Sequence, residues 1–170
     1  MQLPADAKDG AKVTDSSEFL DARKFQAPSA SIGPDTAGRE FEFPGVLANV
    51  AEYRDKVMEF VAEHCPDEGD QIDILVALQE ALANAALHGC KDDPAKMIRC
   101  TVWAGNSDIV IAVRDPGPGF NLALADPENY QATTRRHGRG ICLMRSLMSE
   151  VRFTHHGSEI VLRKHIRHER

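Results

Sequence analysis

Strand-like segments in this chain come in pairs joined by short turns, and no other feature of the sequence restricts the fold as strongly. One pair covers Met97–Ala104 and Asp108–Arg114, with residues 105–107 as the turn between them. A second pair covers about residues 151–154 and 159–166. Strands joined by so few residues pair as antiparallel hairpins, because a parallel connection requires a much longer crossover. The sheet is therefore predicted to be mixed and mainly antiparallel.

Outside these hairpins, one further strand and three helices are predicted. A first strand is predicted at residues 39–43, where charged and aromatic residues alternate. Two helices follow, the first capped by Asn49 and the second capped by Asp70 and ended by Gly89 in a left-handed conformation. A third helix is predicted at residues 138–149. Because strands and helices are grouped, an α+β fold with helices on one face of the sheet is expected.

Composition and charge argue against several classes of protein. The 170 residues suit one domain whose core needs no disulfide or metal. The net charge of −6 and the lack of a lysine-rich cluster disfavour nucleic acid as a direct partner. No signal peptide or membrane-length apolar run is present, so a soluble, cytoplasmic protein is expected. The cysteines lack disulfide or zinc-site spacing and are read as reduced thiols; they are Cys65, Cys90, Cys100 and Cys142.

The N-terminal part of the chain differs in character from the rest. Residues 1–38 contain many small and polar residues and few large apolar ones, so they are predicted to be a largely flexible extension. A short helix is predicted at about residues 16–25, with three apolar side chains for docking on the domain or on a partner. Residues 39–170 are expected to form the folded domain.

Glu80 and Asn84 are the first candidate site residues. They lie one helical turn apart, so both side chains point from one face of the second helix. An Asn carbonyl with phosphate oxygens and water suits Mg²⁺, which prefers hard oxygen ligands. A carboxylate one turn earlier would sit beside the terminal phosphate and accept the proton of an attacking hydroxyl. Taken alone, however, such a pair is more often two solvated residues on a helix.

Asp115 changes that balance, because it ends an apolar strand and is followed by Pro116-Gly117-Pro118-Gly119. The two glycines let the backbone approach a flat ligand. A buried carboxylate here would accept a hydrogen bond from the exocyclic amine of adenine, whereas guanine would present a second acceptor to it. An exposed aspartate in a Pro-Gly turn explains this segment equally well.

A third candidate segment contains Gly138 and Gly140 at the start of the third helix. Glycines there expose backbone N–H groups and the positive end of the helix dipole, which together suit phosphate oxygens. Arg135, Arg136 or Arg139 would add positive charge, although a plain loop-to-helix junction looks the same. The preceding stretch, residues 121–137, has no sustained period and is predicted to be a mobile cover.

Together, E-x-x-x-N, D-x-G-x-G and G-x-G resemble the N, G1 and G2 boxes of the GHKL (Bergerat) ATP-binding fold of gyrase, Hsp90, histidine kinases and MutL. The chain is most similar to the small bacterial anti-sigma factors that are also serine-protein kinases, the SpoIIAB and RsbW type. The likeness covers roughly residues 39–166 and is carried by EFPGVLANV, EALANAALHG, DPGPGF, GRGICLMRSLMSEV and GSEIVLRKHI.

That resemblance implies a two-layer α/β sandwich that holds ATP and Mg²⁺ between its helices and its sheet. Matched motif to motif, Glu80 would be the general base, Asn84 the Mg²⁺ ligand and Asp115 the acceptor for adenine. The other matched positions would complete the nucleotide site: Gly117 and Gly119 beside the base, Gly138 and Gly140 as the phosphate turn, Arg136 towards the γ-phosphate, and Ser158 with its hydroxyl near adenine.

The same resemblance implies an ATP- and Mg-dependent serine/threonine-protein kinase that phosphorylates a STAS-type anti-anti-sigma partner. A sigma factor as second partner and a homodimer are also implied. The chain has no room for the phosphorylated dimerisation helices of a histidine kinase or for the transducer domains of gyrase and Hsp90, which favours a stand-alone kinase. Two alternatives stay open at this point: a nucleotide-gated binding module without turnover, and a slow ATPase.

Overall fold

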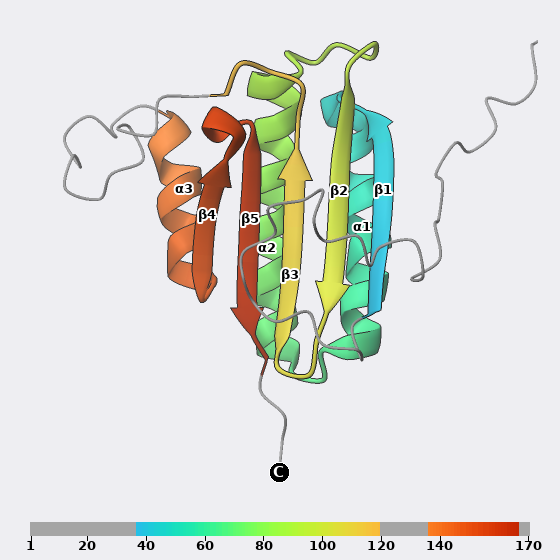
Figure 1. The fold of residues 1–170 in the computed structure, drawn as a ribbon, viewed down its shortest axis with the longest axis vertical. Helices are drawn as coiled ribbons and strands as arrows, with labels where there is room; N and C mark the ends of the chain where they lie inside the picture. The colour runs from blue at the N-terminus through green and yellow to red at the C-terminus, as the bar shows by residue number, and fades with distance from the viewer. Residues whose placement is uncertain (1–36, 120–135, 167–170) are drawn as a thin grey trace, which may run out of the picture.

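Antiparallel pairing of neighbouring strands builds a single five-stranded sheet (Figure 1). The computed structural model describes residues 37–119 and 136–166. Within these residues the strand order is β1-β2-β3-β5-β4, and each neighbouring pair is antiparallel. The strands are β1 (Ala37–Pro44), β2 (Met97–Ala104), β3 (Asp108–Arg114), β4 (Glu150–Thr154) and β5 (Glu159–His165). The prediction of a mainly antiparallel sheet is confirmed.

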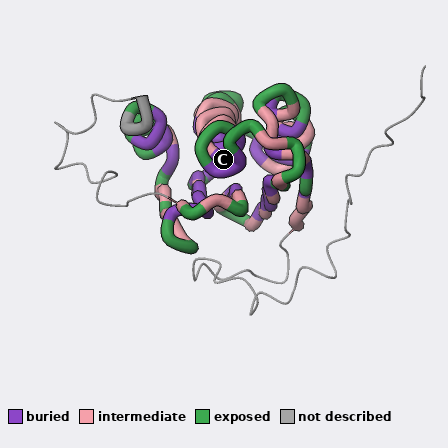
Figure 2. Tube along the Cα trace, turned by 90° about the horizontal axis from the view of Figure 1, so that it is seen from above, coloured by how far each residue is buried: buried purple, intermediate pink, exposed green. Residues whose placement is uncertain are grey.

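One layer of helices covers a single face of this sheet, as two views at right angles show (Figures 1 and 2). The helices of the described residues are α1 (Leu47–His64), α2 (Glu68–Asn84) and α3 (Arg136–Leu147). A π-helical turn, η1 (Ala85–Gly89), continues α2, and a 3-10 turn, η4 (His155–Gly157), joins β4 to β5. Because α2 packs against both α1 and α3, it is the middle helix of the layer. The predicted α+β sandwich is confirmed.

The core lies where the two layers meet, and the buried positions gather there (Figure 2). Alternate side chains of each strand point towards the helices. In β1, Phe43 is fully buried, and its ring stacks on Tyr53 of α1 with 4.0 Å between the ring centroids. On α2, Ile74, Leu78 and Leu82 are fully buried and recur every fourth residue. Because of this spacing, one face of α2 packs into the core, and the flank of the helix is available for polar residues.

The starts of both N-terminal helices differ from the prediction. Asn49 does not cap α1, which begins at Leu47, and the Leu47 N–H donates instead to Oδ1 of Asp92 at 2.7 Å. Asp67, not Asp70, caps α2, because its Oδ1 accepts a hydrogen bond from the Asp70 N–H at 2.8 Å. The cap of α1 comes from a turn far along the chain, which local sequence rules do not consider.

The end of α2 also differs from the prediction. Gly89 is not left-handed; the positive φ angles fall on Lys91 and Asp92, at 58° and 57°. The helix widens instead of ending, and the Cys90 N–H donates to the Ala85 carbonyl oxygen at 2.8 Å, five residues back. Gly89 therefore serves another purpose, which becomes clear from its neighbours in space.

Part of the sequence lies beyond the described ranges. The predicted helix at residues 16–25 and most of the predicted extension (1–38) and cover (121–137) are outside residues 37–119 and 136–166. These assignments stay predictions. Within the two described ranges, no helix combines the length and the apolar character that crossing a bilayer requires.

Ile74→Ala should lower the free energy of unfolding by about 2–5 kcal/mol, because it leaves a cavity under α2. Ile72→Ala is the matched control, since Ile72 lies on the same helix but is 59% exposed whereas Ile74 is 0% exposed. The control should change stability by about 0.5 kcal/mol or less. Urea denaturation measures both, and equal effects would show that α2 does not face the core as described.

Candidate functional site

The end of α2 and the start of α3 approach each other closely at Gly140. A Cβ atom placed on Gly140 would lie 2.7 Å from Oε2 of Glu80 and 3.6 Å from Nδ2 of Asn84. The first distance is shorter than real Cβ contacts, so a side chain at this position would displace the Glu80 carboxylate. The structure thus brings together three of the residues that the motifs single out, one from α3 and two from α2.

Glu80 and Asn84 are both half-buried and open enough to meet a ligand. Their neighbours Ala81 and Leu82 are fully buried, which fixes the face that the two polar side chains share. Within the described part of the chain, neither side chain has a hydrogen bond or ion pair with the protein. A carboxylate and a carboxamide that share one helix face and retain free acceptor atoms can bind a cation, a phosphate-bound metal or a hydroxyl proton.

Asp115 lies directly against Gly89 of η1. The surface of α2 and η1 that runs from Glu80 through Asn84 to Gly89 is called the wall of the candidate site. A Cβ atom on Gly89 would overlap the Asp115 carboxyl group, and one on Gly117 would lie 2.7 Å from Oδ1 of Asp115. The Gly117 N–H donates to that Oδ1 at 2.8 Å. Glycine at both positions therefore lets two backbone segments close around one carboxylate. Sequence reasoning assigned Gly89 to helix termination and missed this contact.

Burial governs the electrostatics at Asp115. Desolvation raises the pKa of its carboxyl group above the ordinary value, and the hydrogen bond from Gly117 partly opposes that rise. Cys90 is fully buried, and burial together with the Asp115 charge raises the pKa of its thiol to about 11. The thiol is therefore neutral at physiological pH and forms an uncharged neighbour of the carboxylate. No sequence motif indicated that Cys90 lies here.

A third backbone segment, η4, packs against the turn that follows Asp115. Gly119 has a φ of +77°, and a Cβ atom there would overlap the His156 carbonyl oxygen. The Asp115 N–H donates to the Ser158 carbonyl oxygen at 3.0 Å. The Ser158 hydroxyl, almost completely buried, donates to the His155 carbonyl oxygen at 2.9 Å. Ser158 is thus placed beside Asp115, with its hydroxyl already bound to the η4 turn.

The π-helical turn gives the two ends of the site a common face. Asn84 follows Glu80 by four residues, one α-helical turn, and Gly89 follows Asn84 by five, one π-helical turn. All three positions therefore look in the same direction along a length of about 13 Å. The wall that they form could accommodate an elongated ligand with a base at Asp115 and phosphates at Glu80.

The glycine segment at the start of α3 differs in one respect from the prediction. The helix begins at Arg136 and not at Gly138, so Gly138 lies in its first turn and Gly140 at the start of its second. Glycine costs about 1 kcal/mol relative to alanine within a helix, and this cost is small enough for the helix to extend through both glycines. The side chain of Arg136 lies outside what the structure describes, and so does the predicted cover up to residue 135.

Comparison with known proteins identifies the family. The histidine kinase-like ATPase domain family matches residues 43–164 of this chain. The chain belongs to that family. The match spans β1 to β5 and includes both ends of the wall formed by α2 and η1, so the ATPase domain contains the whole described part of the candidate site.

Curated relatives of this ATPase domain are bacterial anti-sigma F factors. That of Anoxybacillus flavithermus is 26% identical over 132 residues, which cover 74% of this chain and 90% of the relative. That of Geobacillus thermodenitrificans is 29% identical with the same coverage. That of Clostridium perfringens is 29% identical over 129 residues, covering 72% of this chain and 92% of the relative.

A solved structure supports the fold of the ATPase domain. It contains the RsbU and RsbW domains of a Mycobacterium tuberculosis protein, and it aligns with a TM-score of 0.52 at 20% identity. The alignment covers 78% of this chain and 34% of that longer chain. At this identity the likeness concerns the fold, and it agrees with the sandwich of one sheet and one helix layer.

Gly119→Ala should destabilise the ATPase domain by about 2–4 kcal/mol, because alanine at positive φ is strained and its Cβ would overlap the His156 carbonyl. Gly105→Ala is the control, since the nearest atom to a Cβ there is 3.9 Å away. Chemical denaturation compares the two variants. Equal stability would mean that η4 does not pack on the turn after Asp115.

Proposed function

We propose that this protein is an ATP- and Mg-dependent kinase that phosphorylates a serine or threonine of a STAS-type anti-anti-sigma partner and also binds a sigma factor. The observation that carries the proposal is the position of the Glu80 carboxylate, one turn before Asn84 and against Gly140 of α3. Membership of the ATPase domain family supports ATP as the ligand. The names of the relatives, anti-sigma F factors, support the regulatory role.

Adenine would bind at the Asp115 end of the wall. Asp115 would accept a hydrogen bond from the exocyclic amine, and Gly89, Gly117 and Gly119 let the surrounding backbone segments pack closely enough to hold its carboxyl group in place. One Asp115 oxygen already accepts from Gly117, so the other is available for adenine. Guanine would present a carbonyl oxygen to the same carboxylate, which disfavours GTP.

The phosphates would extend towards Asn84 and the first turn of α3. The Asn84 carbonyl would serve as the protein ligand of Mg²⁺, and the described residues contain no cluster of three His, Cys, Asp or Glu that could hold a metal alone. A site of this kind suits Mg²⁺, which keeps waters and phosphate oxygens as its other ligands. When bound, the ion would neutralise charge that develops on the phosphates. Arg136, Gly138 and Gly140 would complete the phosphate end.

Glu80 would act on the attacking hydroxyl. The partner's serine oxygen attacks the γ-phosphorus, the bond to the β–γ bridging oxygen breaks, and ADP leaves. The serine proton passes to the Glu80 carboxylate, which lies within reach of the start of α3 and has no competing partner among the described residues. The residue therefore orients the hydroxyl and accepts its proton.

Glu80→Gln should reduce phosphoryl transfer by about 100-fold or more, because the amide accepts no proton, while ATP binding persists. The assay follows radiolabelled phosphate from ATP to a cognate STAS-type partner, with Glu59→Gln, an exposed change on α1, as the control. Undiminished labelling would contradict the role of Glu80. ATP-dependent capture of the partner without labelling would indicate a binding module, and phosphate release without the partner would indicate a slow ATPase.

Asp115→Asn should weaken ATP binding about tenfold, because asparagine has one acceptor oxygen for two donors, the Gly117 N–H and adenine. ATP affinity of the parent protein should fall as the pH drops through the pKa of Asp115. Since burial raises that pKa, the fall begins at a higher pH than for an ordinary aspartate.

The same raised pKa predicts that the fold survives this substitution. A carboxyl group whose pKa is raised in the folded state binds protons more tightly there, so its contribution to stability is lost as the pH rises through that pKa. Removing the charge at neutral pH should therefore not lower the free energy of unfolding. Calorimetric titration with ATP at several pH values tests both effects, with Asp108→Asn at the opposite end of β3 as the control. Unchanged affinity in Asp115→Asn would place the adenine elsewhere.

A further inference from the structure

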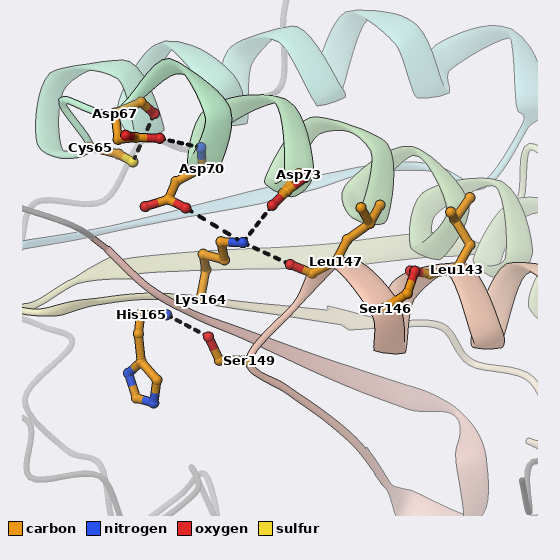
Figure 3. A network of polar contacts seen from close by, with 10 residues as sticks. All are labelled: Cys65, Asp67, Asp70, Asp73, Leu143, Ser146, Leu147, Ser149, Lys164 and His165. Atoms are coloured by element: carbon orange, nitrogen blue, oxygen red, sulfur yellow. Dashed lines mark hydrogen bonds and ion pairs between the residues drawn. The ribbon is translucent and has the colours of Figure 1, made fainter.

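A lysine buried between β5 and the helix layer joins β5, α2 and the end of α3 (Figure 3). Lys164 of β5 is 8% exposed, and its Nζ lies 2.6 Å from Oδ2 of Asp73 and 3.5 Å from Oδ1 of Asp70, both on α2. The same Nζ donates to the carbonyl oxygen of Leu147, the last residue of α3, at 2.8 Å. One ammonium group therefore holds the start of α2 and the end of α3 together.

The charges in this network suit the ends of the two helices. Asp70 and Asp73 lie near the N-terminus of α2, where negative charge is favourable, and the ammonium lies at the C-terminus of α3, where positive charge is favourable. Asp70 is 2% exposed, so removal of Lys164 would leave a buried carboxylate without its cation. One residue further along β5, the His165 N–H donates to the Ser149 hydroxyl at 2.9 Å, which adds a second link to the segment after α3.

Distances along the helices connect this network to the candidate site. On α2, Asp73 precedes Glu80 by seven residues, and on α3, Gly140 precedes Leu147 by seven residues. At 1.5 Å per residue, both intervals are about 10 Å. The two helices run in opposite directions, because the start of one meets the end of the other at both contacts. Because the two intervals are equal and the helices are antiparallel, the contact of Lys164 with Asp73 and Leu147 also places Gly140 level with Glu80.

We propose that Lys164 is a positioning residue, which holds α3 in register along α2 so that the phosphate-binding first turn of α3 faces Glu80 and Asn84. The inference rests on the proposed function for the ligand, but the register itself is a property of the ligand-free protein. Lys164 acts at the end of α3 opposite to Gly140 and does not touch the nucleotide.

The test compares Lys164→Met with a triple variant that adds Asp70→Asn and Asp73→Asn. The triple variant removes the two carboxylate charges together with the ammonium, so it keeps the test valid if Lys164→Met alone does not fold. Lys56→Met is the matched control, because Lys56 pairs with Glu52 on the surface of α1. Two measurements are made on the full chain: hydrogen exchange of the α3 amides without ligand, and calorimetric affinity for ATP and for adenosine.

We expect exchange of the α3 amides to become about tenfold faster in the Lys164 variants, while amides of the central strand β3 keep their protection. We also expect the dissociation constant for ATP to rise about tenfold and that for adenosine to stay unchanged, because only the phosphate end depends on α3. A purely structural role would change both affinities equally or neither.

The inference would be overturned by α3 exchange equal to that of Lys56→Met, or by equal losses of ATP and adenosine affinity. Failure of the proposed function gives a different result, because loss of ATP binding would already appear in the parent protein, and loss of phosphoryl transfer alone would leave both measurements unaffected. Faster α3 exchange combined with unchanged ATP affinity would also contradict the positioning role.

Discussion

The close approach of α3 to α2 at Gly140 is the constraint on which the candidate site depends. A hydrogen atom at this position leaves the Glu80 carboxylate in place, and a methyl group would displace it. Because protein interiors are close-packed, one added carbon atom at Gly140 would change the position of the Glu80 carboxylate relative to the start of α3. The buried face of α2 and the Lys164 network both stabilise the helix positions that make this approach possible.

The other end of the site is built around the Asp115 carboxyl group. Gly89, Gly117 and Gly119 let η1, the turn after β3 and η4 converge around one carboxylate. The partial burial that raises the pKa of Asp115 also strengthens the hydrogen bonds that its carboxyl group accepts. Under the proposed function, a ligand without a donor would leave the second Asp115 oxygen without a partner, and this penalty would disfavour such a ligand.

Local patterns in the sequence predicted the hairpins, the three helices and the face shared by Glu80 and Asn84, because each depends on residues close together in the chain. Contacts between distant residues could not be predicted in this way. Asp92 caps α1 across 45 residues, and Lys164 pairs with Asp73 across 91. Gly89 was identified as a special position for the wrong reason, since its neighbour Asp115 is brought near only by the folded sheet.

The π-helical turn η1 also determines the direction in which the residues after Asn84 point. Successive residues of an α-helix are rotated by about 100°, so a regular helix through residues 85–89 would direct Gly89 away from Asp115. The additional residue in the turn compensates for this rotation. The number of residues between Asn84 and Gly89 is therefore fixed by angle as well as by length, so an insertion or deletion here would turn Gly89 away from Asp115.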